Sequence, residues 1–221
     1  MRRIIGAAFV SLDGVMQGPG GPDEDTTGGF RFSGWLPPVG DDAIEAKIGE
    51  LFGRPFDLLL GRRTYEIFAA YWPYARDEMA DIRDPFNKCT KYVVTHRDQP
   101  LVWDHSERVD GLEALRAVKQ SDGPDLVIQG SSTLYPQLLK AGLLDELTLM
   151  MSPVILGQGK RLFGDGTPPG TMKMTDHRVS DGGNIIATYH PAGPVETGTY
   201  VVEAPSDREQ ARQAAMAEGS W

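Results

Sequence analysis

The sequence alternates between short apolar runs and segments whose apolar residues recur at helical spacing. Short runs with few polar residues are typical of parallel strands that are buried on both faces. The runs occupy residues 3–12, 57–60, 91–95 and 125–129. Between two of them, Tyr65, Phe68, Ala69 and Trp72 lie on one face of a predicted helix. The alternation predicts an α/β fold in which helices flank a mostly parallel central sheet.

The C-terminal half adds a different signal. Asp181-Gly182-Gly183-Asn184 separates two runs at about residues 172–180 and 184–190, which is a strong hairpin signal. We therefore expect an antiparallel C-terminal hairpin at the edge of the sheet. Residues 145–156 form a longer apolar run that Pro153 interrupts, and this pattern predicts an edge strand or a sharply bent strand.

The composition changes after residue 190. Prolines and glycines follow directly, and a final segment rich in Ala, Arg, Gln and Glu offers little apolar surface. We divide the chain into a domain at 1–190 and a C-terminal extension at 191–221. The extension is expected to hold a linker, a short strand at 200–202 and a peripheral helix that begins near Ser206.

The overall composition excludes several classes of protein. The 221 residues carry a net charge of −9 with a pI of about 4.9, which argues against a nucleic-acid-binding surface. Cys89 is the one cysteine, so no intrachain disulfide can form and a reducing compartment is favoured. No apolar run approaches the roughly 20 residues of a membrane span. The four histidines are not spaced like metal ligands, so we expect no metal site. The single cysteine and the lack of a long apolar run together favour a cytoplasmic protein.

Three predicted strand ends carry residues that suit anions. They are Gly61-Arg62-Arg63-Thr64, Thr95-His96-Arg97 and Gly130-Ser131-Ser132-Thr133. The carboxyl ends of parallel strands meet at one edge of a sheet, and helix N-termini there bind phosphates. Taken singly, the serines could be ordinary helix caps and the arginines a solvated helix start. Together the clusters favour a phosphate-bearing dinucleotide, although the usual glycine fingerprint and the Walker A motif are absent.

Short motifs in a fixed order make the chain similar to the dihydrofolate-reductase-like superfamily. Within it, the chain most resembles the reductase domain of the bifunctional deaminase–reductase of riboflavin biosynthesis. The motifs span residues 3–190 and are Ser11-Leu12-Asp13-Gly14, Leu60-Gly61-Arg62-Arg63-Thr64-Tyr65, Tyr92-Val93-Val94-Thr95, Val127-Ile128-Gln129-Gly130-Ser131-Ser132-Thr133-Leu134, Gly142-Leu143-Leu144-Asp145-Glu146-Leu147, Ser152-Pro153-Val154-Ile155-Leu156-Gly157 and Gly159-Lys160-Arg161-Leu162-Phe163.

The resemblance implies NADPH as cofactor. The arginines and the threonine of 62–64 would contact its phosphates, residues 95–97 would lie by the 2′-phosphate, and residues 130–133 would wrap the pyrophosphate. The backbone of the first strand would line the nicotinamide. The implied cofactor-binding residues are Ala7, Ala8, Gly61, Arg62, Arg63, Thr64, Thr95, His96, Arg97, Gln129, Gly130, Ser131, Ser132 and Thr133.

The resemblance also suggests substrate and catalytic residues. Asp13 is similar to an acidic residue that the riboflavin reductases use on their substrate, although it could simply form the turn before Gly14. Asp42, with Asp41, follows Trp35-Leu36-Pro37 at a spacing offset from that of dihydrofolate reductases, and helix capping is the alternative for both aspartates. Trp35, Tyr65 and Tyr71 are candidate stacking surfaces, and Tyr65 could equally belong to the core.

One departure concerns Gln129, where the riboflavin reductases carry an acidic residue; a neutral amide cannot act as a base. We expect an NADPH-dependent reductase of a small heterocycle, resembling 5-amino-6-(5-phosphoribosylamino)uracil reductase. The alternatives are a non-catalytic NADP-binding module and a dihydrofolate or pteridine reductase. From the family, we expect a homodimer that pairs through residues 145–156 and the terminal hairpin.

Overall fold

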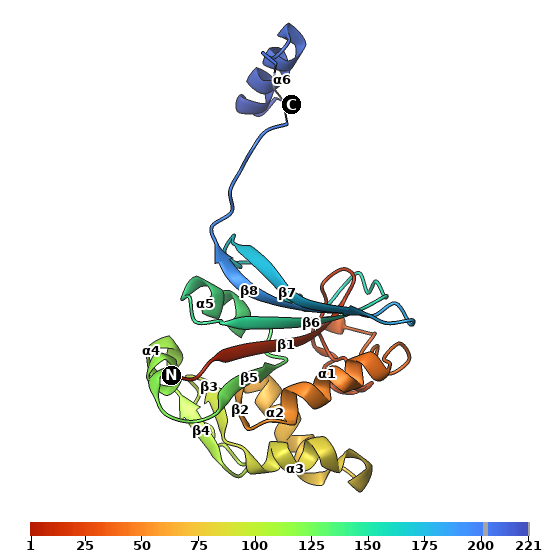
Figure 1. Ribbon diagram of the computed structural model, residues 1–221, viewed down its shortest axis with the longest axis vertical. Helices are drawn as coiled ribbons and strands as arrows, with labels where there is room; N and C mark the ends of the chain where they lie inside the picture. The colour runs from red at the N-terminus through yellow and green to blue at the C-terminus, as the bar shows by residue number, and fades with distance from the viewer. Residues whose placement is uncertain (201–202, 221) are drawn as a thin grey trace.

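A computed structural model describes residues 1–200 and 203–220 of the chain (Figure 1). The described residues form an 8-stranded sheet in the order β4-β3-β2-β5-β1-β6-β8-β7. The strands are β1 (Ile4–Ser11), β2 (Phe56–Gly61), β3 (Lys91–Val94), β4 (Ser106–Val109), β5 (Asp125–Gln129), β6 (Glu146–Ser152), β7 (Thr171–Val179) and β8 (Ile185–Gly193).

The pairing directions confirm the predicted fold class. The pairs from β4 through to β6 are all parallel, whereas β8 pairs antiparallel with β6 on one side and with β7 on the other. The expectation that residues 145–156 form an edge strand is wrong, because β6 lies between β1 and β8. Pro153 follows the last residue of β6, so its missing N–H removes no hydrogen bond from the ladder.

Helices cover both faces of the sheet (Figure 1). They are α1 (Asp42–Phe52), α2 (Arg62–Tyr71), α3 (Ala80–Lys88), α4 (Gly111–Gln120) and α5 (Leu134–Lys140), whereas α6 (Asp207–Ala217) lies away from the sheet. Helices α1, α2 and α3 share one buried apolar cluster, and α4 and α5 share the other.

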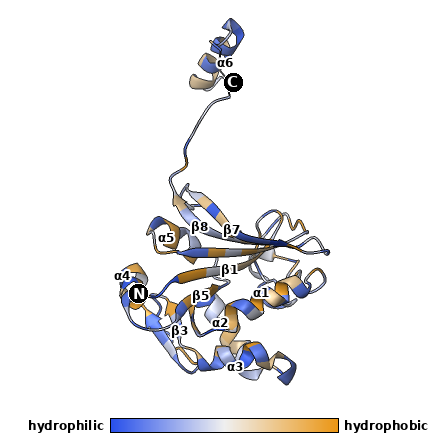
Figure 2. Ribbon diagram, in the orientation of Figure 1, coloured by the Kyte–Doolittle hydropathy of each residue, from blue (hydrophilic) through white to orange (hydrophobic). Residues whose placement is uncertain are grey.

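The inner strands supply side chains to both clusters. In β2, Leu58 and Leu60 belong to the cluster under α1–α3, whereas Leu59 belongs to the cluster under α4 and α5. This alternation is the period of two that a strand imposes on its side chains. It explains why β1 and β5 are hydrophobic along most of their length (Figure 2), as expected for strands buried on both faces.

The C-terminal segment extends away from the sheet (Figure 1). Strand β8 continues to Gly193, three residues beyond the expected boundary at residue 190, because its last residues still pair with β7. The strand predicted at 200–202 falls on Val201 and Val202, which lie outside the described residues. Ser206 caps α6 by accepting a hydrogen bond from Glu209 N, and α6 buries none of its residues.

A buried lysine joins α3 to the sheet. Lys91, the first residue of β3, is 0% exposed, and its Nζ donates to the carbonyls of Asn87 (2.7 Å), Cys89 (2.8 Å) and Asp104 (3.0 Å). The ammonium also lies 4.5 Å from the centroid of the Trp103 ring. Burial lowers the pKa of Lys91, and the three carbonyls provide the hydrogen bonds that a buried ammonium needs.

Replacing this lysine tests its contribution. We expect Lys91→Met to lower the free energy of unfolding by about 2–3 kcal/mol, because buried carbonyls lose their donor. Urea unfolding followed by circular dichroism measures the loss. Lys88→Met, at the exposed end of α3, is the control and should change stability far less. Equal losses in the two variants would contradict a structural role for the Lys91 ammonium.

Candidate functional site

Two loops at the carboxyl edge of the sheet are bonded to each other. Gly61 N, at the end of β2, donates to Ser131 Oγ (2.9 Å), and Ser131 N donates to Thr64 Oγ1 (3.0 Å). The strands β2 and β5 that deliver these loops are neighbours. Two of the three predicted anion clusters therefore lie together, as expected for the carboxyl ends of neighbouring parallel strands. We call this reciprocal pair of hydrogen bonds the loop clasp.

The turn after β5 depends on left-handed backbone. Gly130 has φ +79° and Ser131 has φ +59°, so the chain takes two left-handed residues in succession. A Cβ on Gly130 would lie 3.1 Å from Thr64 Cγ2 and 3.3 Å from Thr64 Oγ1. A glycine is needed at 130 for its conformation and for the close approach of the β2–α2 loop.

The N-terminus of α2 has the properties of an anion site. Its N-cap is Gly61, which has no side chain to satisfy the first-turn N–H groups, and its first turn holds no acidic residue. The free N–H groups and the helix dipole therefore favour a negatively charged ligand. The two arginines that follow have different environments.

Arg62 is already engaged by the protein. Its guanidinium donates to the carbonyls of Gln99 (3.0 Å) and Pro100 (3.3 Å) and pairs with Glu66. Arg63 is exposed, lines the cavity described below and has no side-chain partner among residues 1–200 and 203–220. Arg63 is therefore the arginine available to a ligand.

A cavity of about 920 Å³ opens beside the loop clasp. Residues 61–64 and 129–133 form one end of its lining, the segment 16–25 contributes a second wall, and side chains from α1, α2 and α3 complete it. A volume of this order is typical of cofactor sites. The predicted clusters at 61–64 and 129–133 thus share one cavity.

Gln129 is a buried side chain with an unpaired oxygen beside this cavity. It is 9% exposed, lines the cavity at the end of β5, and its Oε1 has no hydrogen-bond partner among the described residues. A buried acceptor without a donor is costly. The arrangement favours a ligand that brings an N–H or O–H donor to Gln129.

The third predicted cluster lies at the same edge but outside the cavity lining. Thr95 follows β3, the neighbour of β2, and its Oγ1 accepts a hydrogen bond from Arg97 N (3.1 Å). His96 pairs through Nδ1 with Asp110, and both side chains are exposed. Arg97 is exposed too. Residues 95–97 therefore border the loop of Gln99 and Pro100, which holds Arg62.

The predicted nicotinamide residues are inside the sheet. Ala7 and Ala8 are 0% exposed and do not line the cavity, although Ala7 is the direct register partner of Gln129. Phe9, further along β1, does line it. The first strand thus reaches the cavity one residue later than the resemblance implied.

Asp13 is held by the protein rather than presented to the cavity. Its carboxylate accepts hydrogen bonds from Ser11 Oγ (2.7 Å), Leu156 N (3.1 Å) and Gly157 N (2.9 Å), and it pairs with Arg161. These donors lower the pKa of Asp13 to about 2, the Ser11 hydroxyl contributing most. A carboxylate of this kind cannot donate a proton near neutral pH, so Asp13 joins the β1 turn to the 156–157 loop.

The other predicted catalytic residue also lies off the cavity. Asp42 is exposed at the first position of α1 and does not line the cavity. The residue before it, Asp41, is the N-cap and accepts hydrogen bonds from Ala43 N and Ile44 N. Capping, the alternative role considered for these aspartates, is the role observed for Asp41.

Of the three candidate stacking residues, Tyr71 lines the cavity. Tyr65 is 0% exposed, and its hydroxyl accepts a hydrogen bond from Trp103 N (2.8 Å), so it belongs to the core and cannot stack on a substrate. Trp35 is 7% exposed and donates through Nε1 to the carbonyl of Gln17 (2.9 Å), which places it in a small satellite cluster. Both side chains lie outside the cavity lining.

Sequence reasoning missed the apolar part of the cavity and one acidic residue. The half-buried apolar residues Phe9, Leu36, Ile48, Phe68, Trp72 and Ile82 line the cavity. Glu24, in the glycine-rich segment, also lines it, and burial raises the pKa of its carboxyl above the ordinary value. The density of Gly and Pro in residues 17–40 was the available signal for that segment.

The described residues hold no group of three or more His, Cys, Asp or Glu side chains that could bind a metal ion.

Cys89 is partly buried, and burial raises the pKa of its thiol to about 11, which is opposite to the shift that an activated nucleophile needs. No described helix has the length and apolar character required to cross a membrane.

Comparison with known proteins identifies the type of chain. Residues 2–187 match the model of a family described as the RibD C-terminal domain. The uncharacterized protein YyaP of Bacillus subtilis (strain 168) is 25% identical over 199 residues, which cover 86% of this chain and 95% of YyaP.

Solved structures show a shared fold. The diaminohydroxyphosphoribosylaminopyrimidine deaminase/5-amino-6-(5-phosphoribosylamino)uracil reductase of Thermotoga maritima is 15% identical, with a TM-score of 0.58 over 86% of this chain and 57% of that protein. Dihydrofolate reductase from Enterococcus faecalis, complexed with NADP(H), is 18% identical, with a TM-score of 0.52 over 86% of this chain and 96% of that enzyme. The fold is therefore dihydrofolate-reductase-like.

The loop clasp can be tested by a double-mutant cycle. Thr64→Val and Ser131→Ala should each lower the free energy of unfolding by about 1 kcal/mol, because each leaves a backbone N–H without its acceptor. The double variant should lose less than the sum, since both bonds hold one turn. Thr64→Val combined with Ser132→Ala is the control and should be additive. Additive losses in both cycles would show that the two bonds act independently.

The pKa of Asp13 predicts a pH effect on stability. Its carboxyl has a pKa of about 2 in the folded chain against an ordinary 3.8, so the stabilisation is complete above the ordinary value and is lost as the pH falls toward 2. Urea unfolding between about pH 5 and pH 2.5 should show the wild type losing stability more steeply than Asp13→Asn. Parallel pH profiles would contradict the role given to Asp13.

Proposed function

The chain belongs to the RibD C-terminal domain family, as its motifs predicted, and we propose that it is an NADPH-dependent reductase of a small heterocycle. The observation that carries the proposal is the N-terminus of α2, where N–H groups without a side-chain cap, and Arg63, which has no partner within residues 1–200 and 203–220, line a cavity large enough for a dinucleotide. Gly130 supports it, since a glycine there lets the backbone of the second loop come close to the first.

In this proposal each loop has its own role. The first turn of α2 and the guanidinium of Arg63 hold the pyrophosphate, and residues 130–133 enclose it. Gln129 Oε1 accepts a hydrogen bond from the carboxamide of the cofactor or from a ring N–H of the substrate. Arg97, on the exposed loop that follows β3, binds the 2′-phosphate.

NADPH, when bound, supplies a hydride to the carbon of a C=N or C=O bond and leaves as NADP⁺, while the nitrogen or oxygen of that bond gains a proton. The protein aligns the two rings and excludes water from the cavity. Asp13 and Asp42 both lie outside the cavity lining, so we assign the proton to another donor. Solvent, or the cavity-lining carboxyl of Glu24, supplies the proton.

The relatives suggest a pyrimidine or pteridine as the heterocycle. The Thermotoga maritima protein is named as a reductase of 5-amino-6-(5-phosphoribosylamino)uracil, and the Enterococcus faecalis enzyme as a dihydrofolate reductase bound to NADP(H). We place the chain in the cytoplasm as a homodimer. Of the two segments expected to pair, residues 145–156 form β6 inside the sheet, so the hairpin of β7 and β8 is the proposed interface. Strand β7 is at the sheet edge and is exposed along almost its whole length, which leaves its backbone free to pair.

A non-catalytic NADP-binding module of the same fold is the second candidate. It is favoured by the neutral Gln129 in place of an acidic residue, because an amide cannot transfer a proton. The two candidates share cofactor binding and differ in turnover. Binding of NADPH without oxidation in the presence of pyrimidines, pteridines and dihydrofolate would favour the module.

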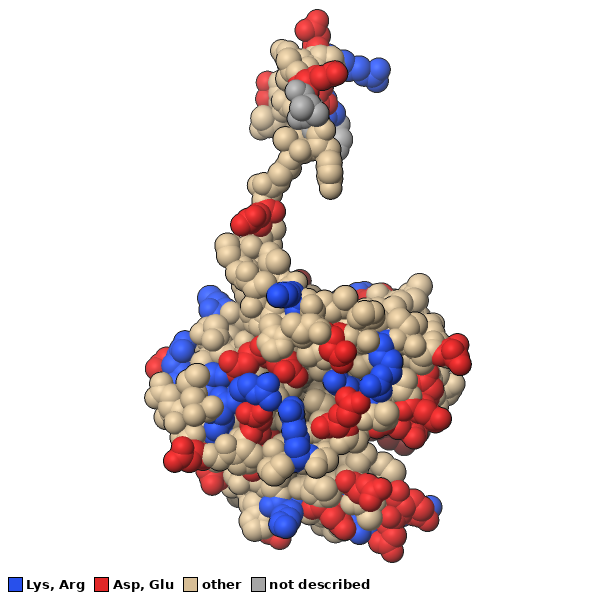
Figure 3. All heavy atoms as spheres, in the orientation of Figure 1, with Lys and Arg blue, Asp and Glu red and all other residues tan. Residues whose placement is uncertain are grey.

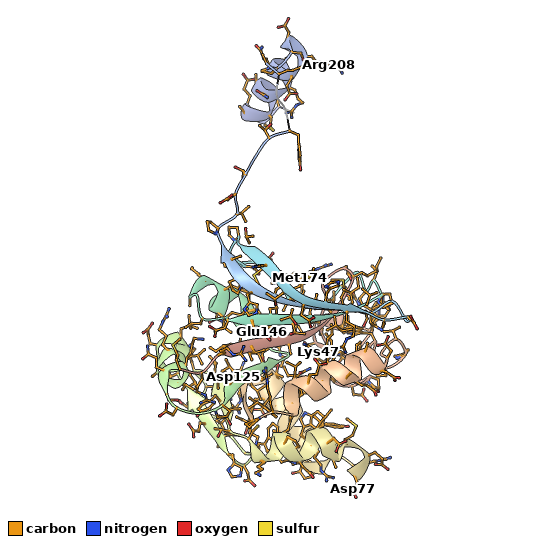
Figure 4. All side chains as sticks on the ribbon, in the orientation of Figure 1. Lys47, Asp77, Asp125, Glu146, Met174 and Arg208 are labelled. Atoms are coloured by element: carbon orange, nitrogen blue, oxygen red, sulfur yellow. The ribbon has the colours of Figure 1, made fainter. Side chains whose placement is uncertain are left out.

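Arg63 provides a direct test of cofactor binding. Arg63→Ala should weaken NADPH about tenfold, because a charge-assisted contact to phosphate is lost. Fluorescence titration with NADPH measures the dissociation constant. Arg208→Ala is the matched control, since Arg208 is an exposed arginine on the distant α6 (Figure 4). Equal affinities in the two variants would remove Arg63 from the cofactor site.

Arg97 tests the preference for the phosphorylated cofactor. Arg97→Ala should weaken NADPH by about tenfold and leave NADH nearly unchanged, since only NADPH carries the 2′-phosphate. The same titration, run with both nucleotides, gives the ratio of affinities. A similar loss for NADPH and NADH would exclude Arg97 from the 2′-phosphate.

A further inference from the structure

The two ends of the cavity differ in chemistry. The end at residues 61–64 and 129–133 is polar and carries the α2 N-terminus. Away from it, the half-buried lining residues from β1, α1, α2, α3 and the segments beside them include a large apolar set, and the charged half-buried residues Glu24, Asp25 and Lys160 belong to the second wall; the apolar set is Phe9, Leu36, Ile48, Phe68, Trp72 and Ile82. These side chains come from β1, α1, α2, α3 and the segments beside them, so the apolar surface surrounds a recess. We call this part the apolar recess.

Aromatic rings pack edge to face behind the recess. Trp72 lies 4.9 Å from Phe86 and 6.2 Å from Phe68, and Phe52 lies 4.8 Å from Phe86, measured between ring centroids. Phe86 is 1% exposed and Phe52 is 6% exposed, so these rings are held in the core. Fixed rings that expose one side to a cavity favour a flat ligand, which gains contact area without ordering side chains.

Free positive charge in the cavity lies at the polar end, whereas the segment 16–25 contributes Asp23, Glu24 and Asp25. Three cationic side chains line the cavity, and two of them are engaged: Arg62 by Glu66 and the 99–100 carbonyls, and Lys160 by Asp25 and Thr27 Oγ1. Among the described residues, Arg63 is the cavity cation without a partner. It can neutralise the phosphates of one ligand, and the proposed function assigns that ligand as NADPH.

The outer rim of the recess carries negative charge. Met79 and Ile82 line the cavity, and their chain neighbours Glu78 and Asp81 are exposed acids. Asp77 begins the same segment, and acidic side chains gather over this end of α3 (Figures 3 and 4). Arg83 is held by Asp77 and Asp84 and does not line the cavity. A phosphate that enters past this rim would meet acidic side chains, and among the residues that the structure describes Arg63 at the polar end is the cavity-lining cation without a partner.

From these observations we infer that the substrate is a flat, uncharged ring that carries no phosphate. The apolar recess holds the ring, and Gln129 Oε1, at the polar end of the cavity, accepts a hydrogen bond from a ring N–H. This inference rests on the proposed function, because it assigns the free cation to the cofactor. It separates this chain from reductases whose substrate is a phosphoribosyl pyrimidine.

A matched pair of ligands tests the inference. The full chain, saturated with NADP⁺ so that no hydride transfer occurs, is titrated calorimetrically with 5-amino-6-(5-phosphoribosylamino)uracil and with the same compound after phosphatase treatment. The dephosphorylated compound should bind at least about tenfold more tightly, because an unpaired phosphate must lose its hydration. Tighter binding of the phosphorylated compound would overturn the inference.

A second experiment places the ring. Quinoxalin-2(1H)-one, a flat uncharged bicycle with a ring N–H, should bind the wild type in ligand-observed saturation-transfer NMR. Met79→Arg puts a cation at the rim of the recess and should weaken binding of this bicycle and narrow the difference in affinity between the two uracil compounds. Met216→Arg, the same exchange at an exposed position of α6, should change neither. Absence of binding of the bicycle, or equal effects of the two variants, would overturn the inference.

The two proposals fail differently. NADPH binding is measured separately by fluorescence. A chain that binds no NADPH therefore contradicts the proposed reductase function, regardless of the affinities measured for the ring compounds. A chain that binds NADPH and prefers the phosphorylated uracil keeps the reductase function and loses the uncharged-substrate inference.

Discussion

The reciprocal hydrogen bonds between Ser131 and the β2–α2 loop are the interaction on which the site depends. They use the N–H of Gly61 and the hydroxyl of Thr64 to hold two strand ends in one arrangement. The N–H groups of Gly61 and Ser131 are used within the protein and are not donors for a phosphate. The Thr64 and Ser131 hydroxyls accept in these bonds and keep their own hydrogens, so they and the remaining N–H groups of the α2 first turn can donate to a phosphate. The loop clasp therefore removes two backbone donors from the site and leaves the other polar groups available to a ligand.

The fold was predictable because its signals are local. Runs such as Leu58–Leu60 contain no polar residue that could face solvent, so a strand there is expected to be buried on both faces. The Gly182-Gly183 turn indicates a hairpin. The position of β6 was not predictable in the same way. Pro153 suggested an edge, but the strand ends one residue earlier, and strand order depends on long-range pairing that no local pattern encodes.

The site was only partly predictable, since the sequence does not show the direction of a side chain. All three clusters were expected together because parallel strand ends share an edge; those at 61–64 and 130–133 line one cavity, whereas residues 95–97 do not line it. Tyr65 was ambiguous between pocket and core, and one helical turn separates it from Phe68, which does line the cavity. Asp13 had the right chemistry for a substrate contact, but backbone N–H groups from the distant 156–157 loop already bind it.

The length of chain between the bonded loops has a consequence for folding. Ser131 lies 70 residues after Gly61 and 67 after Thr64, so the bonds of the clasp close a long loop of chain. The anion site therefore cannot exist until β5 has paired beside β2, and contacts of such sequence separation form slowly. A ligand bound there stabilises only molecules in which this pairing is complete. Cofactor binding during refolding would thus report the closure of the central sheet rather than the formation of its helices.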